Sequence, residues 1–126
     1  MKTEIFTNKA PKPIGPYSQG MKVGNLLFTA GQIALDPESG ELKTQSIEEE
    51  THLIMNHIKV ILEETGMTMI NVIKCSIFLK DMQDFKVVNE VYGTYFKSNP
   101  PARETVQVAA LPLNVNVEIS LIAVKP

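Results

Sequence analysis

The spacing of apolar residues changes along this chain from a helical period to a strand period, and that change restricts the possible folds. In residues 47–62 the apolar side chains recur at helical spacing, as on the buried face of a helix. In residues 72–80 and 115–124 they alternate with other side chains, as in strands with one buried face. This combination predicts an α+β domain in which helices cover one face of a sheet. The helical positions are Ile47, Ile54, Ile58, Ile61 and Leu62.

Capping residues set the limits of two helices. Ser46 and Glu49 match a capping box, in which their side chains bond two otherwise free amides, and Gly66 ends the helix. Asp81 is expected to cap a second helix, which ends before Asn99-Pro-Pro101. The apolar stripe of this second helix is Phe85, Val88, Tyr92, Tyr95 and Phe96.

Turn residues divide the rest of the chain into strands. Gly24 and Asn25 predict a tight hairpin turn, residues 36–40 predict a second turn, and residues 10–16 form a proline-rich loop. The last two strands are expected to pair as a hairpin across residues 111–114. The element order is then β-β-β-α-β-α-β-β, a mostly antiparallel sheet with both helices on one face. The strands are expected at 3–7, 17–23, 26–33, 72–80, 103–110 and 115–124.

Composition favours one globular domain and disfavours several protein classes. The chain of 126 residues is 44% hydrophobic and 21% charged, so residues 1–126 are expected to form a single domain. Its net charge of −2 and the lack of a Lys/Arg run disfavour nucleic-acid binding. It has no apolar leader and no run of about 18 apolar residues, and its one cysteine cannot form an intramolecular disulfide. We therefore expect a cytoplasmic protein without a membrane segment.

Common motifs of catalysis and metal binding are missing from the sequence. It has no glycine-rich nucleotide loop and no C-x-x-C pair. His52 and His57 stand five residues apart on the first helix, on different faces, whereas metal ligands favour i and i+4. Cys75 lies on the apolar face of its strand, where a thiol acts as a small hydrophobic group. We expect these three residues to be structural or solvated.

The end of the chain carries the residues best suited to bind an anion. If the last two strands form a hairpin with Gln107 opposite Glu118, then Arg103, Thr105 and Glu118 project from the same face. Arg103 and Glu118 would lie about 13 Å apart, a gap that could hold a small carboxylate and a water molecule. The alternatives are a surface ion pair of Arg103 with Glu104 or Glu118, and a solvated Glu118.

Several short motifs occur in the order that is typical of one protein family. The motifs are Ile14-Gly-Pro-Tyr-Ser-Gln19, Thr29-Ala-Gly-Gln32, Phe78-Leu-Lys-Asp81, Pro101-Ala-Arg103, Val108-Ala-Ala-Leu-Pro112 and Val117-Glu-Ile119. On these motifs the chain resembles, from residue 10 to residue 124, the RidA family of reactive-intermediate deaminases, also called YjgF-type proteins. The resemblance implies a chorismate-mutase-like α+β fold and a homotrimer with its sites between subunits. It also implies hydrolysis of 2-iminobutanoate, 2-iminopropanoate and their enamine tautomers to 2-keto acids and ammonia, without a metal or organic cofactor.

The resemblance also implies roles for individual residues. Arg103 matches the arginine that grips the substrate carboxylate, and a guanidinium suits this role because it can donate two parallel hydrogen bonds. Glu118 matches the glutamate that holds the attacking water. Tyr17 and Asn89 match residues that line the cleft, and Gly31 offers backbone groups to the ligand. From its own sequence context, Tyr17 could equally fill the core.

The chain departs from the family pattern at a few positions. Thr105 replaces a common cysteine, Ala110 a common arginine and Gly20 a common alanine. The Thr105 hydroxyl can still donate a hydrogen bond, so it stays among the predicted substrate-binding residues. Two other functions stay open: a non-catalytic trimer that binds small carboxylates or regulates a protein, and a chorismate mutase. A mutase should need further cationic residues for a dicarboxylate, and Arg103 is the only arginine.

Overall fold

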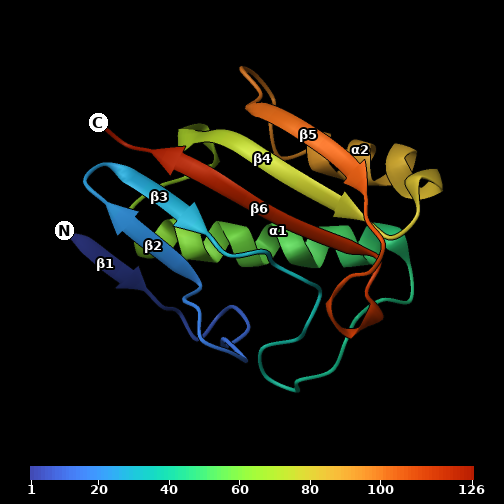
Figure 1. Ribbon diagram of the computed structural model, residues 1–126. Helices are drawn as coiled ribbons and strands as arrows, with labels where there is room; N and C mark the ends of the chain where they lie inside the picture. The colour runs from blue at the N-terminus through green and yellow to red at the C-terminus, as the bar shows by residue number, and fades with distance from the viewer.

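The computed structural model describes residues 1–126 as a six-stranded sheet with two helices (Figure 1). The predicted element order is confirmed. Neither helix has the length and apolar character needed to span a membrane. The elements are β1 (Lys2–Ile5), β2 (Gly20–Val23), β3 (Leu26–Thr29), α1 (Ile47–Glu64), β4 (Val72–Leu79), α2 (Phe85–Gly93), β5 (Ala102–Gln107) and β6 (Val117–Val124), with 3-10 turns at Met69–Asn71, Met82–Asp84 and Pro112–Asn114.

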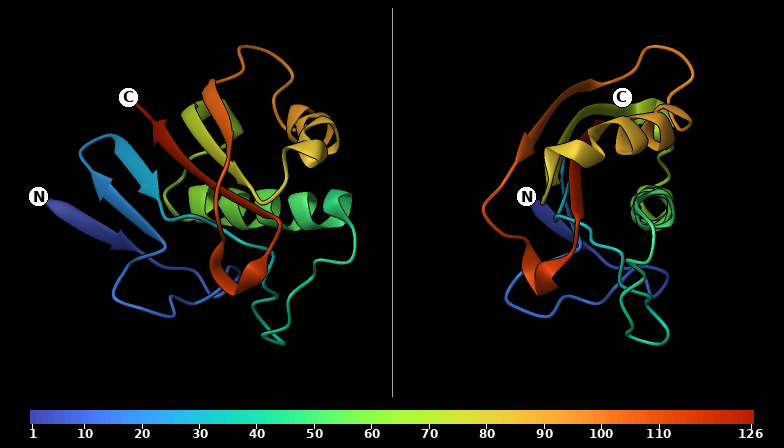
Figure 2. Two further views of the ribbon diagram at one scale, coloured as in Figure 1. Left: turned by 45° about the vertical axis from the view of Figure 1, so that its right-hand side comes forward. Right: turned by 90° about the vertical axis from the view of Figure 1, so that its right-hand side faces the viewer.

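The strands follow one another across the sheet in the order β1-β2-β3-β6-β4-β5. All neighbours run antiparallel except β4 and β5, which run parallel. The sheet is therefore mixed but mostly antiparallel, as predicted. Helix α2 makes the crossover that a parallel pair needs. Both helices lie on the same side of the sheet, as the turned view in Figure 2 shows.

The expected hairpin between the last two strands is wrong. β6 lies between β3 and β4, whereas β5 lies at the edge, beyond β4. Gln107 stands opposite Leu79, and Glu118 stands opposite Phe78. Burial explains this arrangement, because every second residue of β6 is buried and none of β5 is. The more buried strand takes the central position and the exposed, charged strand takes the edge.

The two faces of the sheet differ in their cover. Alternate residues of β6, from Val117 to Ala123, are buried on the face that packs against α1. The opposite face carries no helix, and apolar side chains remain partly exposed on it. Phe28 and Val106 are examples, each 40% exposed. We call this side the open face of the sheet.

The helix ends follow the capping residues with two differences. The Ser46 hydroxyl accepts a hydrogen bond from the Glu49 amide at 3.1 Å, but Glu49 makes no return bond, so only half of the capping box forms. Asp81 caps the 3-10 turn that precedes α2 rather than α2 itself. Helix α2 ends before Tyr95 and Phe96, which pack against the core from the loop that follows.

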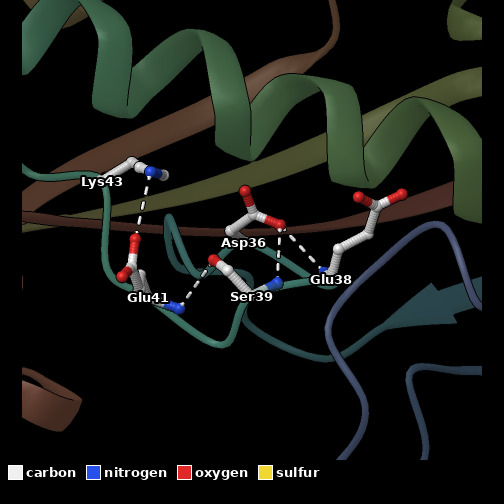
Figure 3. Close-up of polar contacts among 5 residues, drawn as sticks. All are labelled: Asp36, Glu38, Ser39, Glu41 and Lys43. Carbon is white, nitrogen blue, oxygen red and sulfur yellow. Dashed lines mark hydrogen bonds and ion pairs between the residues drawn. The ribbon is translucent and has the colours of Figure 1, made fainter.

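The exposed turn between β3 and α1 is closed by its own polar groups (Figure 3). The Asp36 carboxylate accepts hydrogen bonds from the amides of Glu38 and Ser39 at 2.8 and 3.3 Å, and these bonds lower the pKa of Asp36. The Ser39 hydroxyl accepts one from the Glu41 amide, and Lys43 Nζ lies 3.5 Å from the Glu41 carboxylate. The turn predicted here is confirmed, and the Asp36 and Glu41 carboxylates bond groups within it.

A buried carboxylate joins α1 to the start of β6. Glu50 is 0% exposed. Its Oε2 accepts hydrogen bonds from the amides of Asn116 and Val117 at 2.9 and 3.1 Å, and its Oε1 accepts one from the Asn116 side chain at 2.7 Å. Because these donors satisfy a charge that would otherwise be costly to bury, Glu50 fixes where β6 begins. The sequence pattern gives no sign of this role, because Glu50 follows two exposed glutamates, Glu48 and Glu49.

We expect Glu50→Gln to destabilise the fold. A carboxamide has one acceptor oxygen where donors converge on two, so at least one buried donor loses its partner. The free energy of unfolding should fall by about 2–4 kcal/mol, in line with the cost of losing hydrogen bonds to a charged group. Urea unfolding measures the change. The exposed neighbour Glu49→Gln is the control, expected within about 0.5 kcal/mol of wild type; equal stability of the two variants would contradict the role of Glu50.

Candidate functional site

Arg103 lies on the face of β5 that is turned toward α2. Its Nη1 donates a hydrogen bond to Asn89 Oδ1 at 2.7 Å. Its guanidinium carbon lies 5.0 Å from the centre of the Tyr92 ring and 5.7 Å from that of Phe85. Phe85, Asn89 and Tyr92 occur at i, i+4 and i+7 of one helix, so they share a face. Helix α2 thus holds the Arg103 side chain in place on an edge strand.

Arg103 has no carboxylate partner within the chain. Neither of the two ion pairs in the structure includes it. Its neighbour Glu104 projects from the opposite face of β5, where the Glu104 carboxylate lies 2.9 Å from Lys74 Nζ and accepts a hydrogen bond from the Ser76 hydroxyl. These contacts with Lys74 and Ser76 lower the pKa of Glu104. The surface-pair alternative for Arg103 is therefore wrong, and its charge is available to a ligand anion.

Buried hydroxyl groups without partners lie close to Arg103. Thr105 follows on the same face of β5, and its Oγ1 has no hydrogen-bond partner. The Tyr92 hydroxyl also has none, and burial raises the pKa of Tyr92, so it stays protonated at neutral pH. Burial likewise raises the pKa of Cys75, which stands opposite Arg103 on β4 and is a core residue rather than a nucleophile. An unpaired buried hydroxyl is costly, so Thr105 remains suited to bond a ligand.

Glu118 lies on the open face of the sheet, next to Gly31. Its side chain is half-buried, and burial raises the pKa of its carboxyl group. The chain after Gly31 runs alongside β6, because Gln32 and Ile119 exchange two backbone hydrogen bonds at 2.8 and 3.1 Å. A Cβ atom at Gly31 would come within 2.6 Å of the Glu118 carboxyl group. Glycine at this position therefore leaves the room that Glu118 occupies.

Tyr17 lies in a loop that a buried glutamine holds in place. The Gln19 side-chain oxygen accepts a hydrogen bond from the Thr7 amide at 2.7 Å, and its nitrogen lies 2.9–3.2 Å from three carbonyl oxygens of residues 7–11. This contact ties the proline-rich loop to the start of β2. The Tyr17 side chain is 49% exposed, and its hydroxyl accepts a hydrogen bond from the Ile14 amide at 3.3 Å. Tyr17 is therefore not core filler.

Arg103 and Glu118 do not meet within one chain. Arg103 faces α2, whereas Glu118 projects from the open face. Their partners on β4 are Cys75 and Phe78, so their Cα atoms are two strand spacings and three residues apart, about 14 Å. The expectation that Arg103, Thr105 and Glu118 share a face is wrong, because it relied on the hairpin pairing that does not form.

The predicted site residues thus fall into two groups. The Arg103 group comprises Arg103, Thr105 and Asn89, between β5 and α2. The Glu118 group comprises Glu118 and Gly31 on the open face. Tyr17 makes no hydrogen bond to either group. Two cavities, of about 400 and 460 Å³, adjoin residues 69–70, and none of these side chains lines them.

Both histidines have partners inside the fold. His57 is buried, its Nε2 lies 2.9 Å from the Leu35 carbonyl oxygen, and burial lowers its pKa, so it is a neutral donor at this bond. His52 Nδ1 lies 2.8 Å from the Tyr95 hydroxyl. The structural role expected of both residues is confirmed. Nowhere do three His, Cys, Asp or Glu side chains gather as metal ligands would.

Known proteins resemble this chain along almost its whole length. The profile of the Endoribonuclease L-PSP family matches residues 7–125. A RutC family protein of Pyrococcus abyssi is 52% identical over 124 residues, which cover 98% of each chain. Reactive Intermediate Deaminase A, chloroplastic, of Arabidopsis thaliana is 45% identical over 97% of this chain and 65% of its own. The crystal structure of RidA from an Antarctic Psychrobacter species superposes on this chain with a TM-score of 0.94 at 40% identity. That of E. coli TdcF with bound serine also has a TM-score of 0.94, at 38% identity. Both superpositions cover 98% of this chain and 99% of the other.

These similarities combine a shared fold with shared sequence. The identities are 38–52% over at least 97% of this chain, a range that spans the sheet and both helices. They confirm the family that the short motifs indicate. This chain belongs to the Endoribonuclease L-PSP family, which includes the RidA and YjgF-type proteins.

Proposed function

We propose that this protein is a hydrolytic deaminase that converts small 2-imino carboxylates, such as 2-iminobutanoate and 2-iminopropanoate, to 2-keto acids and ammonia. The observation that carries the proposal is Arg103, the only arginine, which α2 holds in place without a carboxylate partner. Two relatives support this class of substrate. The Arabidopsis relative is named a reactive intermediate deaminase, and the E. coli relative was crystallised with serine, which carries one α-carboxylate.

Arg103 is assigned to the substrate carboxylate. A guanidinium has five N–H donors, and Asn89 takes one of them. Those that remain can form two parallel, charge-assisted hydrogen bonds with a carboxylate. Thr105 Oγ1, unpaired on the same face of β5, can donate one more hydrogen bond. Because the chain offers one arginine, a substrate with one carboxylate fits better than a dicarboxylate.

Glu118 is assigned to the attacking water. Water adds to the carbon of the protonated imine and forms a carbinolamine, whose C–N bond then breaks to give the keto acid and ammonia. Glu118 accepts a proton from the water and returns it to the nitrogen. As the C–N bond breaks, the carbinolamine hydroxyl gives its remaining proton to Glu118 and becomes the carbonyl, and this proton leaves with the ammonia, so one protonated imine and one water give one keto acid and one ammonium ion. This chemistry requires no metal or organic cofactor. The space left by Gly31 keeps the carboxyl group where it can hold the water.

The two groups have to meet between subunits, since one chain holds them on opposite faces of its sheet. The open face carries Glu118 among partly exposed apolar side chains such as Phe28 and Val106. Burial of this face against the β5 edge of another copy would bring the Arg103 group of one subunit to the Glu118 group of the next. A head-to-tail contact of this kind can close into a ring, and a homotrimer is the assembly that we propose.

A non-catalytic trimer that binds carboxylates is the competing function. Such a protein would use Arg103 in the same way, but it would need no half-buried carboxyl group at Glu118. Turnover of an imine by the wild-type protein therefore separates the two functions. Although the family carries the description endoribonuclease, a net charge of −2 without a Lys/Arg run does not favour a nucleic-acid substrate.

The first test is turnover and its dependence on Arg103. With 2-iminobutanoate generated in situ by threonine dehydratase, the protein should accelerate the appearance of 2-oxobutanoate. Arg103→Ala should lower kcat/KM by roughly 30-fold to several thousand-fold, because losing one partner of a desolvated charge pair costs about 2–5 kcal/mol. Arg103→Lys should also lose most activity, because an ammonium cannot make the two-point contact. Lys86→Ala, which removes an exposed charge from α2, is the control, and wild-type turnover in Arg103→Lys would refute the carboxylate contact.

The second test concerns the Glu118 carboxyl group. Glu118→Gln should lower kcat by roughly 10²–10⁴-fold, with little change in affinity for 2-oxobutanoate. Gly31→Ala should act in the same direction without unfolding the protein, because its methyl group displaces only the movable end of the Glu118 side chain. Since burial raises the Glu118 pKa and the ionised form is the base, kcat/KM should fall with decreasing pH at values above the usual carboxyl range. Ser120→Ala, on the same face of β6, is the control; normal kcat in Glu118→Gln would contradict the role of Glu118 in holding the water.

The third test asks whether the site lies between subunits. Arg103→Ala and Glu118→Gln chains, unfolded together and refolded as a mixture, should recover about a quarter of wild-type activity, because about half the chains retain each residue and both must meet at one interface. Each variant refolded alone should stay inactive. Sedimentation equilibrium should give the mass of a trimer. A mixture that stays inactive, or a stable monomer at micromolar concentration, would contradict the shared site.

A further inference from the structure

We propose that Phe85 and Tyr92 are positioning residues, whose rings hold the Arg103 guanidinium in place for a substrate carboxylate. This inference rests on the proposed function for the nature of the ligand. Its structural basis is the geometry of one helix face and one side chain. Nothing in the sequence motifs assigns a role to either ring.

The spacing of the two rings matches the position of the guanidinium. Phe85 and Tyr92 are seven residues apart on α2, a separation of about 10 Å along a helix axis. The guanidinium carbon of Arg103 lies 5.7 Å from one ring centre and 5.0 Å from the other. The guanidinium is therefore near both rings of this helix face. Both contacts fall within the range in which a ring face attracts a cation.

The hydrogen bonds of Arg103 leave its edge available. Asn89, four residues after Phe85 on the same helix face, takes only Nη1. The other N–H donors of the guanidinium have no hydrogen-bond partner within the chain. A two-point contact with a carboxylate requires donors that lie in one plane and point the same way. Rings that restrict the rotation of the guanidinium therefore keep those donors in a fixed direction.

The two rings differ in how firmly they are held. Tyr92 is 5% exposed and belongs to the hydrophobic core, so its ring is held firmly by its neighbours. Phe85 is 38% exposed at the first position of α2, so its ring is held less firmly, at the surface. The contact of Tyr92 with Arg103 is made by the ring, whose centre lies 5.0 Å from the guanidinium carbon. Phe85 can be changed with little effect on the core, which makes it the cleaner position to test.

The single arginine supplies a direct probe. In protein labelled with ¹⁵N only in arginine, the Nε–Hε group of Arg103 gives one NMR signal. Ring currents from Phe85 and Tyr92 should shift this signal from its position in a free arginine peptide. Titration with 2-oxobutanoate should shift it further and give a dissociation constant without any need for turnover.

The variants separate positioning from packing. Phe85→Leu and Tyr92→Leu should each reduce the ring-current shift, weaken 2-oxobutanoate binding by about 3–10-fold, and raise KM with kcat nearly unchanged. Tyr92→Phe keeps the ring and should behave as wild type in all three measurements. Val87→Ala, at a residue of α2 that is 39% exposed and does not contact Arg103, is the matched control. Thermal melts establish that each variant is folded.

The outcomes distinguish this inference from the proposed function. If folded Phe85→Leu leaves both the Arg103 signal and the dissociation constant at wild-type values, the positioning role is wrong. The same holds if 2-oxobutanoate fails to move the signal in the wild-type protein. If the keto acid binds and the variants weaken it while no imine is turned over, the positioning role stands and the deaminase proposal fails.

Discussion

Successive side chains of β6 point to opposite faces of the sheet, so burying Val117 and Ile119 against α1 places Glu118 on the open face. A shift of one residue would bring Glu118, Ser120, Ile122 and Val124 to the buried face in place of the residues that now pack there. The Glu50 carboxylate prevents such a shift by bonding the amides at the start of the strand. The positions of β3 and β4, which pair with β6 on either side, follow from this register.

The helices and strands could be predicted because the apolar residues of each recur at the spacing typical of a helix or of a strand. Alternation and helical spacing identify which residues are buried together, and they gave the correct order of strands and helices. They do not identify which strand lies next to which. The β5–β6 pairing was therefore wrong, and with it the shared face of Arg103 and Glu118, since both depended on a neighbour relation that the burial of β6 decides.

The sequence predicted individual site residues but not which of them lie together. A lone arginine after two prolines and a glutamate between apolar neighbours stand out in the sequence, and Asn89 does contact Arg103. Buried polar residues such as Glu50 and Gln19 do not stand out, because one lies in an acidic helix turn and the other beside a loop. Their partners are distant in sequence or belong to the backbone, so no spacing rule reveals them. Phe85 and Tyr92 were predicted as apolar stripe residues, and their contact with a cation became visible only with β5 in its place beside β4.

The bonds of Gln19 have a consequence for how the protein responds to its solvent. Every group that holds the proline-rich loop is uncharged: a carboxamide, one amide and three carbonyl oxygens. Dissolved ions screen attraction between charges but leave such neutral bonds almost unaffected. Rising ionic strength would therefore weaken the hold of Arg103 on an anion while the loop that carries Tyr17 keeps its shape. Added salt would therefore weaken the binding of an anionic ligand without unfolding the loop at the binding surface.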